Sequence, residues 1–416
     1  MKKHLLLFGI VFLTSLGPAF GQEFWERIYT LPDSCSRTYD IATNAQGDIF
    51  VATDKGLYKS SDYTETWESL WWERNHNCTA LDISPNDRVC FGTNYGSLYF
   101  SDDNGLSWED VAVPHGGGGS FVYRVKYFGN DTIFALPTCL GSGAYVDYSF
   151  DGGNTWNYKI VGNWALNYTT DITMSPDRTF YVCLGYMGSK EEEKRPVMGG
   201  VFKSHDCMEW ERVEISNSIE NCFSAICYSP ASKRIFVGDC EPLYKGNRKT
   251  ESDFIQLMYI YGCLVLDNNT VVTTSFSETG VSFDGGDSFS YFSDTNGGNR
   301  IIVGKDGHLY STRYAYYDSN VRLSRSINPV DDLLKVTENL SNHEIQIFPN
   351  PATDQVNVFS ETSNINLTVF SNDGALIESR EVFNSHIIDV SRYKTGIYLF
   401  QISTNGITTT HKIIIK

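Results

Sequence analysis

Aromatic residues in four loop-like segments are the side chains best suited to bind a ligand. These segments are 71–77, 162–168, 185–200 and 313–318. Flat aromatic rings offer large contact surfaces to sugar rings and to peptide partners. The residues that we expect on this ligand-binding surface are Trp71, Trp72, Trp164, Tyr168, Tyr186 and Tyr316. For any single ring, packing inside the fold is the more frequent outcome, so this surface is an expectation to be tested against the structure.

Catalysis would need a different set of side chains, and the sequence does not identify one. A glycoside hydrolase requires two carboxylates at a fixed separation. The most acidic loop, 185–200, carries three glutamates from Glu191 among basic residues, which is typical of a solvated surface loop. His115 precedes four glycines and has no candidate partner nearby in the sequence, and no lysine or helix start follows to form a phosphate cradle. A binding role is therefore favoured over an enzymatic one.

Ten cysteines lie between Cys35 and Cys263, and the tail beyond has none. Their spacings include no CxxC or CxxxH pattern, so we expect no metal site and no cofactor. In an oxidising compartment some cysteines pair. We expect a mixture of buried free thiols and a few disulfides.

A short pattern centred on an aspartate recurs five times and predicts tight turns between strands. The copies are SSDYTETW (60–67), SDDNGLSW (101–108), SFDGGNTW (149–156), SHDCMEW (204–210) and SFDGGDSF (282–289). Their aspartates are Asp62, Asp103, Asp151, Asp206 and Asp284. Aspartate accepts backbone N–H bonds within turns, and glycine adopts a positive φ at little cost. We therefore expect a structural role for these aspartates, and a packing role for the aromatic residue that ends each copy.

Each copy lies within a longer unit of four short strands, as in CTALDIS, VCFGT, GSLYFS and WEDVAV between residues 78 and 113. Seven units can be counted, although unit five lacks the aspartate pattern and unit seven lacks its last strand. In unit five, the segment FIQLM (254–258) is expected to be the outermost strand. The segment FWERIYTL (24–31) is similar to the outer strands of other units, so we expect it to pair beside residues 321–326 and close a ring. The sequence thus predicts an all-β fold with a seven-bladed β-propeller over residues 22–327. Six or eight blades remain open because two units are degraded.

The repeated pattern resembles the Asp-box, S-x-D-x-G-x-T-W, also called the BNR repeat. Copies one and four lack the glycine, and the last copy has Phe289 in place of tryptophan. The resemblance extends to sialidases, other glycoside hydrolases and sortilin-like receptors. A sialidase would carry an FRIP-type motif near its start, which the segment ERIYTLP (26–32) does not reproduce. The resemblance therefore implies a binding protein or, as the alternative, a glycoside hydrolase that is not a sialidase.

Residues 1–21 predict a secretory signal peptide. Two lysines precede an apolar run over residues 5–13, and small residues follow at Ala19 and Gly21. Cleavage after Gly21 would leave Gln22 at the mature N-terminus, with no cysteine near enough for a lipoprotein anchor. No later segment reaches transmembrane length. The formal net charge of −17 argues against nucleic acid as a partner.

The end of the chain predicts a second, smaller β domain. Residues 328–344 are polar and are expected to form a linker, and seven alternating segments over 345–416 predict a compact Ig-like β-sandwich. The segments FPNPATDQVNV, SNDG, YKTGIYLFQI and KIIIK resemble the type A C-terminal sorting domain of the type IX secretion system. This resemblance implies a Gram-negative, Bacteroidetes-type source and recognition of residues 345–416 by the outer-membrane translocon and sorting machinery.

Together these features predict a protein that is secreted or displayed on the outer cell surface. We expect it to hold a glycan or protein ligand on the propeller face opposite the repeated turns. Paired carboxylates across a cleft on that face would instead favour a glycoside hydrolase.

Overall fold

The structure is a computed structural model, and its chain divides into two compact units, Met1–Pro329 and Val330–Lys416. The residues that it describes are 24–115, 120–139, 143–162, 167–186, 199–213, 215, 223–239, 248–249, 254–258, 260–266, 269–275, 278–287, 289–293, 298–312, 323–330, 345–348, 352–360, 365–371, 375–382, 385–404 and 407–416. The predicted signal peptide and most of the predicted linker lie outside them. All regular elements within them are β-strands, which confirms the predicted all-β class.

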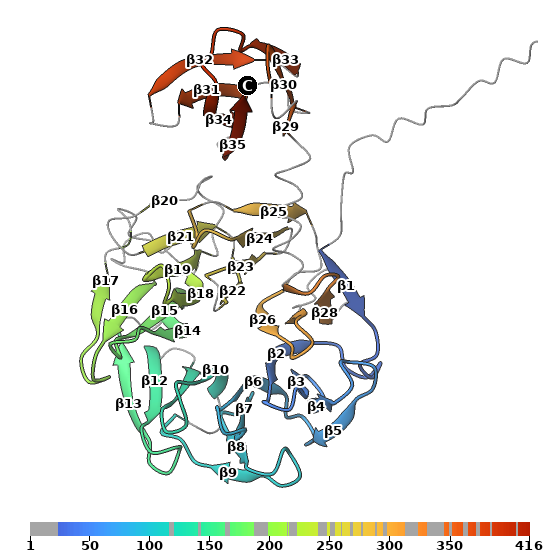
Figure 1. The fold of residues 1–416 in the computed structure, drawn as a ribbon. Helices are drawn as coiled ribbons and strands as arrows, with labels where there is room; N and C mark the ends of the chain where they lie inside the picture. The colour runs from blue at the N-terminus through green and yellow to red at the C-terminus, as the bar shows by residue number, and fades with distance from the viewer. Residues whose placement is uncertain are drawn as a thin grey trace, which may run out of the picture. The chain divides into compact units, whose positions relative to one another are not determined.

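The first unit contains seven four-stranded sheets in its described residues. The innermost strands are β2 (Thr38–Thr43), β6 (Cys78–Ile83), β10 (Ser120–Tyr127), β14 (Asn167–Met174), β18 (Phe223–Ser229), β22 (Gly262–Val265) and β26 (Arg300–Val303). Each innermost strand lies against the innermost strand of the next sheet, and β26 lies against β2 (Figure 1). The seven sheets therefore form a closed ring.

Further strands extend each sheet outward. The second strands are β3 (Ile49–Thr53), β7 (Val89–Thr93), β11 (Ile133–Cys139), β15 (Phe180–Tyr186), β19 (Arg234–Asp239), β23 (Val271–Thr274) and β27 (Leu309–Thr312). The third strands are β4 (Gly56–Ser60), β8 (Leu98–Ser101), β12 (Gly143–Ser149), β16 (Gly200–Ser204), β21 (Phe254–Met258), β24 (Glu278–Ser282) and β28 (Leu323–Ser326). The outermost strands are β5 (Glu68–Trp71), β9 (Glu109–Val111), β13 (Asn157–Val161), β17 (Glu211–Val213), β20 (Arg248–Lys249), β25 (Ser290–Ser293) and β1 (Trp25–Ile28).

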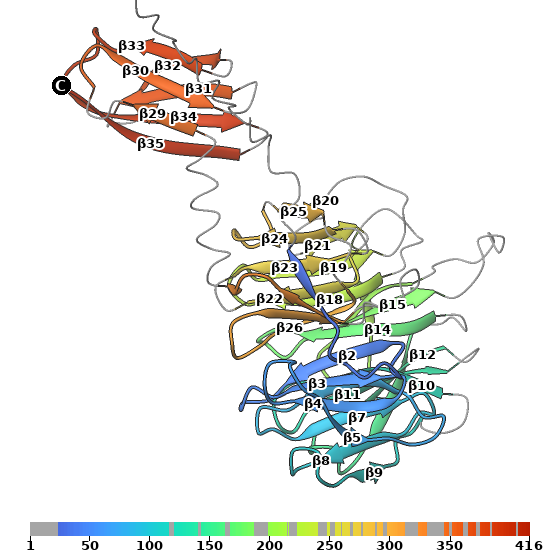
Figure 2. The same ribbon diagram turned by 90° about the vertical axis from the view of Figure 1, so that its right-hand side faces the viewer.

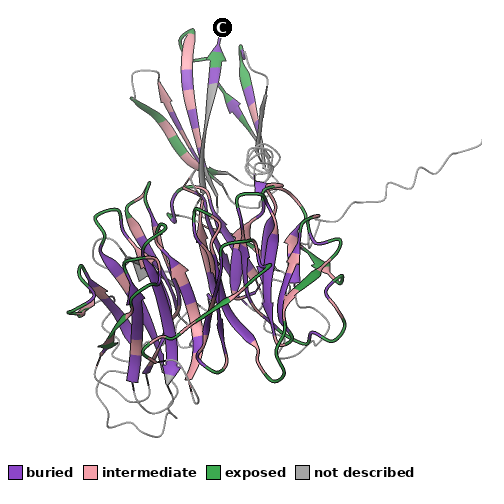
Figure 3. Ribbon diagram, turned by 90° about the horizontal axis from the view of Figure 1, so that it is seen from below, coloured by how far each residue is buried: buried purple, intermediate pink, exposed green. Residues whose placement is uncertain are grey.

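Burial follows the position of a strand within its sheet (Figure 3). The second strands β3 and β7 are buried at every residue, IFVAT and VCFGT. Their sheets are covered on both faces by neighbouring sheets, so both sides of each strand are apolar or small rather than alternating. The outer strand β9 is exposed at Glu109 and Asp110. The core of this unit is thus a series of layers between sheets.

A β-bulge recurs in the innermost strands of the first five sheets. The pairing register with the second strand skips one residue at Tyr39, Thr79, Tyr123, Thr170 and Ser224. Three of the bulged residues use their hydroxyls to join neighbouring sheets, and one of them is Ser224, whose Oγ donates to Ile260 O just before β22. Thr79 Oγ1 donates to Val122 O at 2.7 Å, and Thr170 Oγ1 donates to Phe223 O at 2.8 Å. The bulge thus turns a side chain toward the next sheet.

The ring closes through the N-terminal strand. β1 pairs antiparallel with β28, and Trp25 lies opposite Ser326. Trp25 is fully buried, and its Nε1 donates to Thr279 Oγ1 at 2.7 Å. This pairing confirms the closing strand predicted from the segment 24–31. It leaves β28 as an inner strand instead of an edge.

The fifth sheet differs from the prediction. The segment FIQLM, expected to be the outermost strand, is the third strand β21 and pairs in parallel with β19. The outermost position belongs to β20. This unit lacks the repeated turn that, in the first four sheets and the sixth, joins the third and fourth strands as a hairpin. Without that turn the pairing order is set less strongly by local sequence.

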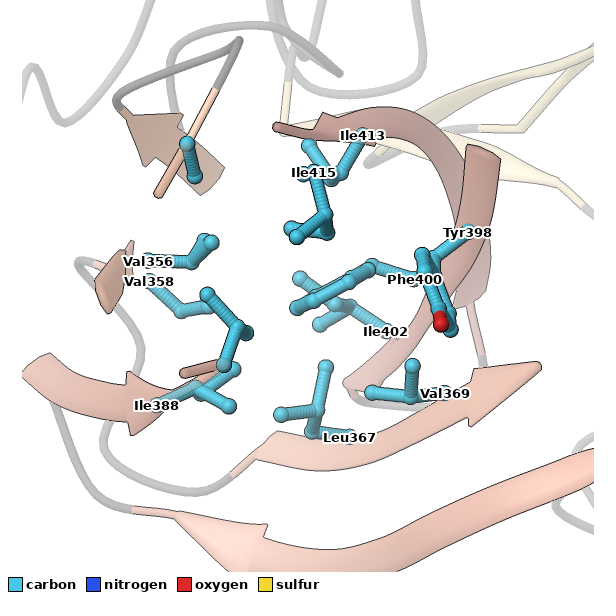
Figure 4. Packing of buried hydrophobic residues seen from close by; sticks show 12 residues of the cluster. Val356, Val358, Leu367, Val369, Ile388, Tyr398, Phe400, Ile402, Ile413 and Ile415 are labelled. Atoms are coloured by element: carbon cyan, nitrogen blue, oxygen red, sulfur yellow. The ribbon is translucent and has the colours of Figure 1, made fainter. Parts of the chain in front are cut away.

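The second unit is a β-sandwich, described here by itself. A three-stranded sheet is formed by β29 (Ile345–Phe348), β30 (Gln355–Ser360) and β33 (Ser385–Asp389). A four-stranded sheet is formed by β32 (Leu376–Val382), β31 (Ile365–Ser371), β34 (Gly396–Thr404) and β35 (Ile407–Ile415) (Figure 2). Val356 and Ile388 from the first sheet face Leu367 and Phe400 from the second across a buried core (Figure 4). Lys416 donates its backbone N–H to Ala352 O at 2.8 Å, which fastens the last residue to the sandwich.

Candidate functional site

In the repeated turns, the aspartate carboxylates accept hydrogen bonds from residues of the same turn. In the second turn, Asp103 accepts the backbone N–H of Ser107 at 2.9 Å and its hydroxyl at 2.6 Å. The Ser101 hydroxyl donates to Asp103 at 2.7 Å and accepts the Gly105 N–H at 2.8 Å. These bonds stabilise the charged carboxylate and lower the pKa of Asp103 to about 2. A carboxylate engaged in this way supports a turn and is not positioned for acid–base chemistry.

The other turns keep this arrangement to different degrees. Asp62 and Asp151 repeat every bond of the second turn, and the pKa of Asp151 is likewise lowered to about 2. In the shortened fourth turn, Asp206 accepts the Met208 N–H at 2.8 Å. In the last turn the Ser282 hydroxyl donates to Asp284 at 2.7 Å. All five aspartates therefore take part in local turn contacts.

A left-handed backbone residue occurs at the same position of each turn. Gly105 and Gly153 occupy it with φ values of 91° and 93°, whereas Thr64 and Cys207 adopt 78° and 62° without the benefit of glycine. A non-glycine residue in this region costs about 1–3 kcal/mol. The turn geometry is thus preserved where the sequence pattern is degraded.

The two predicted tryptophans at the end of β5 have different environments. The Trp71 ring packs against Phe91 and Tyr99 of the next sheet, with ring centroids 4.9 and 5.2 Å away. Trp72 is 63% exposed. Trp71 therefore belongs to the packing between sheets, and Trp72 is the one of the pair available to a ligand.

Tyr95 is a surface aromatic residue near this point that the sequence reading did not select. It is 41% exposed, and its ring lies 4.4 Å from that of His76. His76 in turn stacks on Trp71, and its Nδ1 lies 2.7 Å from a carboxylate oxygen of Glu73. Tyr95 follows the second strand β7, and the antiparallel pairing of β7 with β6, in which Cys78 lies opposite Thr93, brings it to the end of the 72–77 segment. The sequence feature that could have identified Tyr95 is a tyrosine in a tight turn at the end of a predicted strand.

Within the described residues, the other predicted aromatic side chains do not form a common exposed surface with Trp72. Tyr168 is half-buried on β14, with its ring 5.8 Å from Tyr123, and burial raises the pKa of its hydroxyl. Trp164 and Tyr316 lie outside the described residues, as does the side chain of Tyr186. The acidic loop from Glu191 also lies outside them.

A charge cluster occupies the axis of the ring. Arg124 donates from Nη1 to both Asp40 oxygens, at 3.0 and 3.1 Å, and from Nε to Asp171 at 3.1 Å. Asp40 also accepts the Leu81 N–H at 3.0 Å, and Asp171 accepts the Ile226 N–H at 3.3 Å. Five innermost strands are thereby joined through one partly buried guanidinium. Because backbone amides and Arg124 already engage both carboxylates, neither is free to act on a substrate.

A cavity of about 160 Å³ lies beside this cluster and is bounded by innermost strands. Its charged lining residues are Asp40, Asp82, Arg124, Lys126, Asp171 and Arg300. Lys126 pairs with Asp82 at 3.5 Å. Three acidic and three basic residues therefore surround the cavity, which gives a formally neutral and strongly polar wall.

His115 has a partner that the sequence did not indicate. Its Nδ1 lies 2.7 Å from Asp147 Oδ1, and its backbone N–H donates to Asp147 Oδ2 at 3.1 Å. Asp147 is fully buried, and this desolvation raises the pKa of its carboxyl, partly offset by His115. Tyr145 and Tyr158 flank the imidazole, with ring centroids 3.7 and 4.6 Å away. No candidate partner lies near His115 in the sequence, because the contact joins residues 32 positions apart, one in the loop after β9 and the other on β12.

Both expected states of cysteine occur in the described residues. Cys227 and Cys263 form a disulfide between β18 and β22. Five further cysteines are buried free thiols, and burial raises the pKa of Cys207 to about 12. The free cysteines are Cys35, Cys78, Cys90, Cys183 and Cys207. Thiols held neutral in this way are poor nucleophiles.

The described residues include neither a cluster suited to bind a metal ion nor a membrane-spanning helix. No group of three His, Cys, Asp or Glu side chains is placed to hold a metal ion in that part of the chain. The same residues include no helix with the length and apolar character needed to cross a membrane.

Residues 346–416 match the family described as secretion system C-terminal sorting domain. This match confirms the sorting domain predicted from the sequence. A sorting domain of this kind implies interaction with the type IX secretion machinery, and export to the cell surface or the medium in Bacteroidetes. No curated protein sequence matches the chain.

Solved structures share the fold of the first unit. YCF48 bound to D1 peptide is 14% identical with a TM-score of 0.51, over 75% of this chain and 99% of that one. Virginiamycin B lyase from Staphylococcus aureus is 12% identical with a TM-score of 0.55, over 73% of this chain and 98% of that one. At these identities the similarity concerns the fold alone, which is all-β and propeller-like.

Proposed function

We propose that this protein is a secreted or cell-surface binding protein that holds a glycan on the propeller face opposite the repeated turns. The observation that carries the proposal is Trp72, whose ring is 63% exposed at the end of β5. β5 begins directly after the turn 60–67, so Trp72 lies at the opposite end of that strand. An exposed indole of this size offers a stacking surface for a sugar ring.

The surroundings of Trp72 favour a sugar over a purely apolar partner. Glu73 and Asn75 are exposed next to it, and Tyr95 adds a second exposed ring from the neighbouring sheet. Sugar recognition combines aromatic faces with convergent hydrogen-bonding groups. The proposal also includes a protein as the ligand, because exposed tryptophan and tyrosine side chains serve as anchors in protein interfaces.

The alternative, a glycoside hydrolase, receives less support. The axial aspartates Asp40 and Asp171 are engaged by Arg124 and by backbone N–H groups. Hydrolysis would need an acid that can protonate the leaving oxygen and a second free carboxylate. The described residues thus favour binding.

We further propose a four-part organisation for the chain. It consists of a signal peptide over 1–21, an Asp-box propeller over 22–327, a linker over 328–344 and an Ig-like sorting domain over 345–416. The seven closed sheets support a seven-bladed propeller. The local bonds of Asp62, Asp103, Asp151, Asp206 and Asp284 support the Asp-box assignment.

A glycan array probed with the mature chain, residues 22–416, tests the binding function. We expect Trp72→Ala to weaken binding of a retained glycan by about 10- to 30-fold, because an aromatic anchor contributes about 2 kcal/mol. The control is Tyr63→Asn, which removes an exposed ring from the repeated turn of the same sheet and should leave binding unchanged.

Two results would contradict this function. Equal glycan binding by Trp72→Ala and the unaltered protein would place the ligand elsewhere. Release of sugar from any glycoside in a parallel hydrolysis screen would replace binding with catalysis.

A further inference from the structure

Arg300 is a buried guanidinium with few partners. It lies on β26 in the wall of the axial cavity, and its side chain is 10% exposed. Its one hydrogen bond within the described residues runs from Nη1 to Asn299 O and is long, at 3.4 Å. Asp40 lies 3.8 Å from Nε, which allows an ion pair without a hydrogen bond. A guanidinium has five N–H donors, so most of those of Arg300 are left for a group inside the cavity.

Arg124 shows what a structural arginine looks like in the same place. It makes three hydrogen bonds to two carboxylates, at 3.0 to 3.1 Å. Asp40 also receives backbone N–H groups, so little acceptor capacity remains there for Arg300. Buried charges without hydrogen-bonding partners are costly. The difference between the two arginines indicates that Arg300 has a purpose other than holding the ring together.

The cavity wall next to Arg300 contains a second unsatisfied polar group. Asn299 Oδ1 is buried and accepts no hydrogen bond within the described residues. A side-chain amide can present either its oxygen or its NH₂ group after a half turn, so Asn299 can donate to an anion beside Arg300. The Tyr123 ring lies 5.8 Å from the Arg300 guanidinium and limits its movement.

We propose that the axial cavity is a binding site for a small carboxylate, held by Arg300 and Asn299. The planar guanidinium matches a carboxylate through two parallel N–H···O bonds, a fit that ammonium groups do not offer. The nearby acids do not prevent entry, because Arg124 and Arg300 together offset Asp40 and Asp171, and Lys126 pairs with Asp82, so the lining is formally neutral before the acid enters. A cavity of about 160 Å³ has room for a compact organic acid. This site is separate from the glycan surface at Trp72.

Thermal melting of the mature chain with acetate and with acetamide tests the proposal. The two probes have nearly the same shape, and acetamide lacks the charge. At equal ionic strength, we expect acetate to raise the melting temperature of the propeller unit in a saturable way and acetamide not to raise it. Equal responses to the two probes, or no response to acetate at about 100 mM, would overturn the site.

Variants at the two arginines connect the response to Arg300. We expect Arg300→Gln to melt near the unaltered protein and to lose the acetate response, and Arg300→Lys to bind acetate at least about ten-fold more weakly. Arg124→Gln should instead destabilise the ring strongly, because it leaves Asp171 without a counter-charge and Asp40 with only the more distant Arg300. A full acetate response in Arg300→Gln would contradict the proposal. If that variant does not fold, the acetate affinity of Arg300→Lys decides, and an unchanged affinity would equally contradict it.

The size of the acid is tested with glucuronate, with glucose as its neutral control. The proposal expects glucuronate to bind no more tightly than acetate. Glucuronate binding that is more than about ten-fold tighter and is lost in Arg300→Gln would overturn the assignment to a small free acid. It would show that the carboxylate belongs to a larger sugar.

Discussion

At the scale of single residues, the same kind of side chain serves different purposes in different places. Asp103 is exposed and stabilises a turn, Asp147 is fully buried against His115, and Asp40 accepts hydrogen bonds from Arg124 on the axis. The turn aspartates were predictable because their partners lie within a few residues. The contacts of Asp147 and Asp40 were not, because they join residues 32 and 84 positions apart that meet only when the sheets form a ring.

The low pKa of Asp103 leads to a prediction about acid stability. Its pKa is about 2 in the folded protein, below the ordinary value of 3.8, so its turn bonds stabilise the fold above pH 3.8. That contribution declines as the pH falls through about 2, where the folded carboxylate becomes protonated. We expect Asp103→Asn to lower the melting temperature at pH 7, and the difference from the unaltered protein to shrink between pH 4 and pH 2.

Asp110, exposed on β9 outside the turn, provides the control for this measurement. Asp110→Asn should change the melting temperature little at either pH. A difference for Asp103→Asn that stays constant between pH 4 and pH 2 would show that the turn bonds do not depend on the charged carboxylate.

At the scale of elements, hydroxyls on the bulged innermost strands connect one sheet to the next. Thr170 Oγ1 donates to Phe223 O in the next sheet at 2.8 Å and contacts Cys183 O in its own sheet at 3.0 Å. We expect Thr170→Val to lower the free energy of unfolding of the propeller unit by about 1–3 kcal/mol, because buried carbonyls lose their donor while the shape is kept. Calorimetry on the mature chain measures this as an earlier propeller transition.

Thr173→Val on the same strand is the matched control. The Thr173 hydroxyl makes no hydrogen bond within the described residues, and its side chain is half-buried. It should change the transition by less than about 0.5 kcal/mol. An equal loss in both variants would mean that the cost comes from packing on β14 and not from the joining bond.

Most strands could be predicted because their pattern is local. Apolar runs between turn residues located the first four sheets, and the repeated turns fixed which hairpins they form. The fifth sheet shows the limit of this reasoning. Its segment 254–258 was expected to be the outermost strand, but it pairs in parallel with β19 as the third strand. Tertiary contacts determine this pairing, and no turn pattern in the sequence specifies them.

At the scale of the whole propeller unit, stability depends on a contact between its two ends. Trp25 is fully buried on β1 and bonds to Thr279 of the neighbouring sheet. We expect Trp25→Ala to destabilise this unit by about 3–5 kcal/mol, because a large cavity opens where the ring closes. The transition of the sorting domain should stay in place, since that unit has its own core. Calorimetry separates the two transitions.

Trp72→Ala removes the same side chain from an exposed position and serves as the control for Trp25→Ala. Its effect on unfolding should be below about 0.5 kcal/mol. If Trp25→Ala melts like Trp72→Ala, the ring does not depend on its closing strand.

Ring closure was foreseeable from the sequence because the segment 24–31 is similar to the outer strands of other units. The exposed aromatic surface was harder to predict from the sequence. Whether a tryptophan is covered depends on the neighbouring sheet, as the contrast between Trp71 against Phe91 and the exposed Trp72 shows.

The position of β28 has a mechanical consequence. This strand leads out of the ring toward the sorting domain, and it is paired on both sides, over four residue pairs with β1 and three with β27. A load that reaches β28 along the chain must therefore break hydrogen bonds on both of its sides, and not on one side as at a free edge. The protein's first strand therefore reinforces the point at which the tail would pull.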